Sequence, residues 1–223
     1  MYRNPGQDQA DAEFDVQRER IGHALRRINE LAVISDETTI DADALASVAA
    51  TLEEAAARIE EHGVRLLPRP EIRPAPGARR GWMGSAVSGA GNAIAPPLIN
   101  DETVDGVHHA RLVLGAAYSG TAGNAHGGIV ACVFDEFLAH VLGDVGVQAM
   151  TGTLTLRYRH PTPLYRELHL TTWLHSFEGR KVISRGELHD GDTLCVEAEA
   201  LYITLSYEDV RQRSLERDGI AGK

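Results

Sequence analysis

The clearest prediction comes from the stretch Asn124-Ala-His-Gly-Gly-Ile-Val-Ala-Cys-Val-Phe-Asp-Glu-Phe-Leu-Ala-His140, which is typical of one apolar helix that opens with two glycines. From about Gly127 to Leu142, apolar residues surround most of the helix, as expected for a helix packed inside a domain. Glycines at a helix start let a ligand approach the first unpaired N–H groups, whose dipole favours negative charge such as a developing oxyanion. The stretch therefore predicts a central helix with a binding or catalytic site at its N-terminus.

One carboxylate interrupts the apolar surface of this helix. Asp135 lies among large apolar side chains, where a charge is costly unless it is paired or used, whereas Glu136 is expected to point into solvent. Asp135 follows Gly128 by seven residues, so both share a face but lie roughly 10 Å apart along the axis. A general base works at about 3 Å. A two-fold dimer with antiparallel central helices would solve this, because Gly127 and Gly128 of one protomer would meet Asp135 of the other.

Short segments with alternating or apolar patterns follow and precede the helix, and tight turns such as Glu178-Gly179 separate several of them. Successive strands joined by tight turns form antiparallel sheets, and a single helix between them packs against the sheet. The predicted fold class is therefore α+β. The predicted strands are Val107 to Leu114, Thr151 to Tyr158, Glu167 to Phe177, Lys181 to Leu188 and Thr193 to Tyr207.

The length of 223 residues fits one domain with an extension. Apolar residues at helical spacing predict a helical hairpin within residues 1–66, and a Pro- and Gly-rich connector covers residues 67–100. The strand-and-helix domain is expected at 101–207 and a C-terminal tail at 208–223. The hairpin is interpreted as a packing or dimer-stabilising extension, with a lid over a ligand site as the alternative.

Composition excludes several classes of function. The net charge is −10, from 22 basic and 32 acidic residues without a basic block, so a nucleic acid is not expected as a partner. Two cysteines, no secretory leader and no apolar run near ~20 residues predict a cytoplasmic protein without a membrane span. The ten histidines are scattered and no nucleotide-binding loop is present, so neither a metal nor a nucleotide cofactor is expected.

An ordered set of motifs resembles the hotdog-fold acyl-CoA thioesterases, closest to their PaaI-like and carboxyl-terminal-modulator-protein branches. The set consists of His126-Gly-Gly128, Asp135 nine residues after the histidine, and Met150-Thr-Gly-Thr-Leu-Thr-Leu-Arg-Tyr-Arg-His-Pro-Thr-Pro163. The resemblance covers roughly residues 92–206. It implies an antiparallel sheet wrapped around one central helix, with the N-terminal helical extension outside the shared domain.

The resemblance also implies roles for single residues. Asp135 would activate water or attack the thioester carbonyl itself. The amide of Gly127 or Gly128 would bind the oxyanion, and His126 would hold the thioester region or order its loop. Thr151 matches the threonine that positions the water in the modulator-protein branch, with an ordinary strand residue as the alternative.

Coenzyme A carries phosphates, which basic side chains bind well. Arg157 and Arg159 share one face of a strand, and Arg180 with Lys181 follows a hairpin turn, so these four are candidate substrate contacts. A solvated basic face is the competing interpretation. Asn124, in the loop before the helix, is a further candidate contact.

The resemblance, together with the spacing of Gly127, Gly128 and Asp135, implies a homodimeric hydrolase with a composite active site, which would convert acyl-CoA and water to a fatty or aromatic acid and free CoA. Pairing of dimers into tetramers stays open, and no cofactor is expected, since CoA belongs to the substrate.

One alternative is a hydratase or dehydratase of the same fold. Such an enzyme would need an Asp–His pair, but His140 lies about 140° from Asp135 around the helix, which makes that pair unfavourable. Another is a non-catalytic acyl-CoA-binding sensor with the helical hairpin as its output. Cys132 is a weak candidate nucleophile, because no histidine is placed beside it and free cysteines are usually buried.

Overall fold

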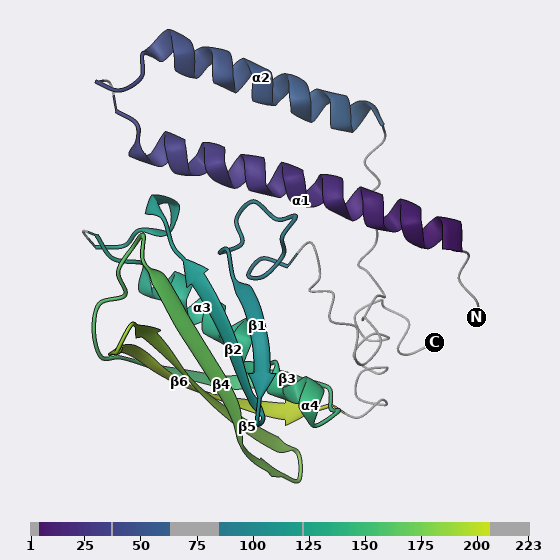
Figure 1. Ribbon diagram of the computed structural model, residues 1–223, viewed down its shortest axis with the longest axis vertical. Helices are drawn as coiled ribbons and strands as arrows, with labels where there is room; N and C mark the ends of the chain where they lie inside the picture. The colour runs from purple at the N-terminus through teal and green to yellow at the C-terminus, as the bar shows by residue number, and fades with distance from the viewer. Residues whose placement is uncertain (1–4, 37, 63–84, 122, 206–223) are drawn as a thin grey trace, which may run out of the picture.

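The computed structural model describes residues 5–36, 38–62, 85–121 and 123–205 (Figure 1). The predicted tail at 208–223 and most of the predicted connector, at 67–84, lie outside the described residues. Among the described helices, none combines the length and the apolar character needed to cross a membrane.

Six strands in the described part of the chain form one antiparallel sheet that curls around a helix, which confirms the hotdog fold (Figure 1). The sheet order is β1-β2-β4-β5-β6-β3, so β3 is an edge strand. The strands are β1 Ile99–Val104, β2 Val107–Val113, β3 Ala149–Tyr158, β4 Glu167–Glu178, β5 Lys181–Asp190 and β6 Thr193–Thr204.

Strand β1 was not expected, because Ile99–Val104 is acidic and has little apolar alternation. It pairs with β2 through the turn at Asp105 and Gly106, whose φ angles are both positive, at 49° and 77°. Paired residues with positive φ are the geometry of a type I′ hairpin turn, and Asp-Gly is among the sequences that adopt it most readily. The turn therefore brings a polar segment into the sheet.

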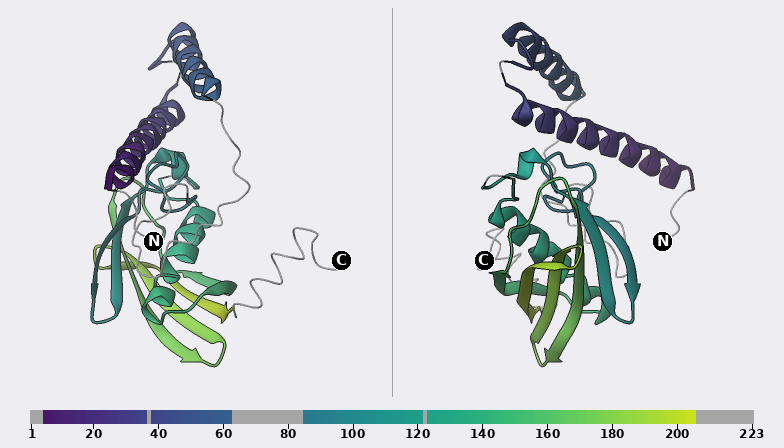
Figure 2. Two further views of the ribbon diagram at one scale, coloured as in Figure 1. Left: turned by 90° about the vertical axis from the view of Figure 1, so that its right-hand side faces the viewer. Right: turned by 60° about the vertical axis from the view of Figure 1, so that its left-hand side comes forward.

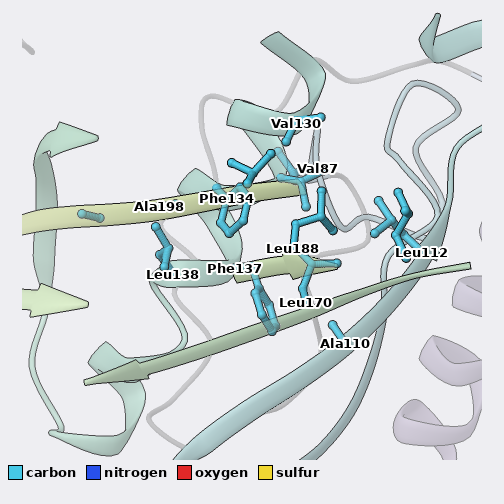
Figure 3. Packing of buried hydrophobic residues seen from close by; sticks show 14 of the residues in the cluster. Val87, Ala110, Leu112, Val130, Phe134, Phe137, Leu138, Leu170, Leu188 and Ala198 are labelled. Carbon is cyan, nitrogen blue, oxygen red and sulfur yellow. The ribbon is translucent and has the colours of Figure 1, made fainter. Parts of the chain in front are cut away.

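The central helix α3 spans Gly127–Leu138, four residues shorter than predicted. It ends where the N–H groups of Ala139 and His140 donate to carbonyls three residues back, and the short helix α4, Val141–Asp144, follows. Phe134 and Phe137 of α3 are completely buried. Figure 3 shows these side chains beside Leu170 and Leu188 of the sheet. The core thus fixes α3 against β4, β5 and β6.

Two helices form the N-terminal extension, as predicted: α1 at Pro5–Ile34 and α2 at Ala42–Glu61. The Asp41 carboxylate caps α2 by accepting the N–H of Ala44 at 2.7 Å. Both views of Figure 2 show α1 lying across one end of the domain and α2 on the far side of α1. None of the residues of α2 is buried, whereas α1 contacts the short 3₁₀ turn η1, Ala116–Tyr118.

Candidate active site

The N-terminus of α3 is held by side chains from two directions. His126 is the N-cap residue, with φ −67° and ψ 129°, and its Nδ1 accepts the N–H of Gly128 at 3.0 Å. On the other side of the same peptide, the Tyr158 hydroxyl donates to the Gly127 carbonyl oxygen at 2.7 Å. The peptide that joins the two glycines is therefore fixed at both its polar atoms.

The two glycine amides are not equivalent as oxyanion donors. The Gly128 N–H is already bound by His126, whereas among the described residues the Gly127 N–H has no partner. Burial raises the pKa of Tyr158, which keeps its hydroxyl protonated and able to donate. The free donor at this helix end is thus the N–H of Gly127. It adjoins the Gly127–Gly128 peptide, which Tyr158 and His126 hold in place.

A pocket of about 350 Å³ opens beside this helix start. It brings together Asn124 and Arg159, two of the predicted substrate contacts, with Gly127 and Tyr158. Arg159 is also paired with Glu197 of β6 at 2.6 Å. Sequence reasoning missed Tyr158, although its place two residues from Leu156 in an alternating strand could have assigned it to the helix-facing side.

At the other end of α3, Asp135 accepts a hydrogen bond from the Thr151 hydroxyl at 3.0 Å. Simple alternation along β3 would put Thr151 on the outer face with Thr153. The register with β6 skips one residue, since Thr151 pairs with Tyr202 and Thr153 with Leu201, so Gly152 is the extra residue of a β-bulge. A bulge reverses the side-chain alternation beyond it. It therefore turns Thr151 toward the helix and Asp135.

The two acidic residues of α3 have the opposite environments to those predicted. Asp135 is exposed in the single chain, whereas Glu136 is half-buried and accepts hydrogen bonds from the hydroxyls of Ser85, at 2.6 Å, and Ser88. The segment around Ser85 covers this face of the helix and supplies the donors that a shielded carboxylate needs. Sequence reasoning treated that segment as an extended connector that wraps over the domain but assigned it no contact with Glu136, so Glu136 was expected in solvent.

The basic candidates do not form one cluster within the chain. Arg157 and Arg159 lie at the end of the sheet near the start of α3. Lys181 lies at the opposite end, in register with Ile203 of β6, and Arg180 donates to the Thr204 carbonyl oxygen. A single chain therefore offers two separate basic pairs along the sheet.

The competing chemistries find little support in the geometry. Cys132 was expected to be buried but is exposed at the surface of α3. The neighbouring protein still removes part of the water around its sulfur, and this desolvation, followed by the negative charges of Asp135 and Glu136, raises the pKa of the thiol and disfavours the thiolate. His140 packs edge-on against Phe137, with ring centroids 5.0 Å apart, and does not form an Asp–His pair with Asp135. In the described part of the chain, no three metal-binding side chains gather.

An antiparallel sheet that curls around one central helix places the protein in the class of hotdog-fold proteins. No protein-family model matches the chain. A solved structure of a thioesterase superfamily protein is 31% identical, with a TM-score of 0.71, over 83% of this chain and 94% of its own. The chain therefore belongs to the thioesterase superfamily of hotdog-fold proteins.

Two curated relatives are similar over a shorter region. The acyl-coenzyme A thioesterase THEM4 of Mus musculus is 34% identical over 96 residues, and that of Xenopus laevis is 33% identical over 97 residues. The matches cover 42% and 41% of this chain, and the chain spans about two fifths of the length of each relative.

Proposed function

We propose that this protein hydrolyses acyl-CoA thioesters to free acids and coenzyme A. Membership in the thioesterase superfamily and the names of the two curated relatives support this substrate class. The observation that carries the proposal is the hydrogen bond between Asp135 of α3 and Thr151 of β3, together with the N–H of Gly127 at the start of α3, which has no partner among the described residues. Hydrolysis needs a base and an oxyanion donor, and these groups supply both.

The proposed reaction uses the side chains in a fixed order. The Thr151 hydroxyl and the Asp135 carboxylate hold a water molecule, and Asp135 takes its proton as the water oxygen bonds to the thioester carbon. The Gly127 N–H stabilises the oxyanion of the tetrahedral intermediate. The C–S bond then breaks, the CoA sulfur leaves as a thiolate, and it receives the proton from Asp135. Direct attack by the carboxylate, followed by hydrolysis of the anhydride, is the alternative for the first step.

A single chain cannot bring these groups together. Eight residues separate Gly127 from Asp135, which is about 12 Å along a helix. The composite site requires a second copy, and the edge strand β3 offers the pairing surface. A two-fold axis through Thr155 sets Leu154 opposite the second copy's Leu156, with both side chains on the helix face.

The same axis completes the site. Because Gly152 is the extra residue of the bulge, Thr151 then lies opposite the second copy's Tyr158. Thr151 is bonded to Asp135 and Tyr158 to Gly127, so the pairing places the carboxylate of one copy beside the free amide of the other. We therefore propose a homodimer with two composite active sites.

The pairing also bears on coenzyme A binding. Antiparallel β3 strands bring the Arg180–Lys181 end of one sheet beside the Arg157–Arg159 end of the other. We assign these four residues, with Asn124 in the pocket at the helix start, to contacts with the substrate. The negative phosphates of CoA would then be held by basic groups from both copies. No further cofactor enters the reaction, and the two-cysteine content supports a cytoplasmic location.

The test is release of free thiol from short, long and aromatic acyl-CoAs by the wild type and by Asp135→Asn. Loss of the base should lower kcat by ~10²-fold or more, while the exposed position of Asp135 leaves folding intact. Asp105→Asn, in a turn with positive φ that asparagine adopts readily, is the matched control and should be fully active. Tight acyl-CoA binding without turnover of any thioester would replace the hydrolase by the sensor.

A further inference from the structure

Helix α1 contacts the domain through polar and small residues, while most of its large apolar side chains remain exposed. Gly22 is buried, and Arg26 and Glu30, at successive intervals of four residues, are partly buried against the domain. Ile21 and Leu25, on another face, remain 48% and 38% exposed. Since these exposed apolar side chains contribute little to the contact, hydrogen bonds from polar side chains fix where α1 lies.

Among these residues, Glu30 makes three hydrogen bonds to the domain through one carboxylate. Its carboxylate accepts the N–H groups of Ala116 at 2.7 Å and Ala117 at 2.9 Å, and the Tyr165 hydroxyl at 2.7 Å. Burial raises the pKa of Glu30, but the hydrogen bonds from Ala117, Tyr165 and Ala116 outweigh it and hold the pKa below its usual range. The carboxylate is thus ionised at neutral pH and accepts three hydrogen bonds from the domain.

This carboxylate replaces a missing local cap. The 3₁₀ turn η1 begins after Gly115, which has no side chain to bind the first N–H groups of the turn. A Cβ atom at Gly115 would lie 2.6 Å from the Glu30 carboxylate oxygens, so a conventional capping side chain does not fit there. Glu30, 86 positions earlier in the chain, therefore accepts the N–H groups that a Ser or Asp at the N-cap position would normally bind.

The turn η1 is linked directly to the start of α3. The carbonyl oxygen of Tyr118 accepts the N–H of His126 at 2.8 Å, and Ser119 forms a β-bridge with Ala125. Gly120 packs so closely that a Cβ atom there would lie 2.8 Å from the His126 Cα. A displacement of η1 would therefore move His126, whose side chain caps α3 next to the Gly127 amide.

We propose that Glu30 is a positioning residue for the active site, which holds η1 and thereby the His126–Gly128 peptides in the geometry that binds the oxyanion. It acts through the loop and does not touch the substrate. The proposal rests on the proposed thioester hydrolysis. It gives the N-terminal extension a role in catalysis that the core domain does not supply by itself.

The first arm of the test compares Glu30→Ala and Glu30→Gln by steady-state hydrolysis of an acyl-CoA that the wild type turns over. Glu30→Ala should lower kcat by ~10- to 100-fold with a smaller change in KM, because only Asn124 of the assigned substrate contacts lies in the loop that Glu30 holds, whereas the oxyanion donor shifts directly. Ala116 and Ala117 donate to different oxygens of the carboxylate, and Glu30→Gln keeps only one of them, so its kcat should lie between those of Glu30→Ala and the wild type. Glu13→Ala, at an exposed position of the same helix, is the matched control and should match the wild type.

The second arm follows amide hydrogen exchange by mass spectrometry in the full-length chain. Glu30→Ala should speed exchange across residues 115–128 and leave strands β5 and β6 unchanged. Arg26→Ala removes the bonds from Arg26 to the carbonyl oxygens of Asn92 and Ala90 but leaves Glu30 in place. It should change both exchange at 115–128 and kcat less than Glu30→Ala does.

Several outcomes would overturn the proposal. Wild-type kcat and exchange in Glu30→Ala would remove the role altogether, and faster exchange throughout the sheet would make Glu30 a general stability residue. An equal kcat loss in Arg26→Ala would assign the effect to the docking of α1 as a whole. If the wild type hydrolyses no acyl-CoA, the proposed function fails, and the exchange pattern alone still decides whether Glu30 holds this loop.

Discussion

The two ends of helix α3 differ in how much of their environment one chain supplies. The N-terminal end is surrounded by its own chain: His126 caps it, Tyr158 fixes its first peptide, and η1 is tied to Glu30 of the extension. At the other end, the Asp135 carboxylate accepts one hydrogen bond within the described residues, from Thr151, and is exposed beside the edge strand β3. One end is complete and the other is open.

In the proposed composite site, the two ends of α3 meet different requirements. An oxyanion donor must be rigid, because its stabilisation depends on dipoles that are already oriented before the reaction. A base needs access to water and substrate before the site closes, and an exposed carboxylate on an edge has that access. In the proposed homodimer, the exposed Asp135 end of each copy lies against the Gly127 end of the other.

The largest effect is expected from removal of the oxyanion donor. Gly127 is the first residue of α3, a position at which proline is tolerated, and His126 already has the extended backbone that a residue before proline requires. Gly127→Pro should therefore keep the helix but delete the N–H, and lower kcat by ~10²- to 10³-fold.

Gly127→Ala is the control for this substitution. Its Cβ atom meets the Tyr158 hydroxyl at 3.3 Å, so it tests the crowding alone while it keeps the N–H. It should retain most of kcat in the same thiol-release measurement. Equal losses in the two variants would mean that crowding, and not the lost amide, causes the defect, and that another group binds the oxyanion.

A mixing experiment sharpens the comparison between the two ends. Gly127→Pro and Asp135→Asn chains are each nearly inactive, but a heterodimer of the two combines an intact amide with an intact carboxylate in one of its two sites. Random reassociation of equal amounts should restore about a quarter of the wild-type kcat, because half of the dimers are mixed and each has one working site. Unmixed variants at the same total concentration are the control, and a mixture as inactive as its parts would rule out the composite site.

A smaller effect is expected at the open end. Thr151→Val removes the hydroxyl that bonds to Asp135 but keeps the size and β-branching of the side chain. The water or the carboxylate then loses one orienting contact, and kcat should fall by ~10-fold, short of the ~10²-fold loss from removal of the base itself. Thr151→Ser keeps the hydroxyl and should stay within about threefold of the wild type; a normal kcat in Thr151→Val would make Thr151 an ordinary strand residue.

The contrast between the two ends also explains what the sequence predicts well. Helix α3 and strands β2 to β6 follow from apolar spacing, which is a local signal, and the glycines at 127 and 128 mark the helix start in the same way. Strand β1 is polar and forms only because a turn and a neighbouring strand pair it. The motif resemblance identified Asp135 and Thr151, but their contact depends on the bulge at Gly152, which alternation cannot reveal.

The remaining errors concern contacts between distant segments. Glu136 is shielded because Ser85 and Ser88 reach it from about 50 positions earlier, and Glu30 caps η1 from 86 positions away. No local pattern in the chain encodes such pairs, since each partner alone resembles an ordinary surface residue. Burial of a carboxylate is therefore predictable from the sequence only when its donors are nearby in the chain.

The smallest expected effect concerns pH and the far end of α3, where His140 lies between Phe137 and His108. Burial, reinforced by the nearby His108, lowers the pKa of His140, against the opposing charges of Glu136 and Asp144. The unfolded chain then binds more protons than the folded chain once the pH falls below about 6.5, so stability decreases from there down to the lowered pKa. The slope from this one group is at most about 1.4 kcal/mol per pH unit.

Urea unfolding between pH 7.5 and 5 measures this effect. The free energy of unfolding should depend less steeply on pH in His140→Gln than in the wild type, whereas His175→Gln, at an exposed position, should keep the wild-type slope. Equal slopes in all three proteins would show that other groups govern the acid response and that His140 titrates as it does in the unfolded chain.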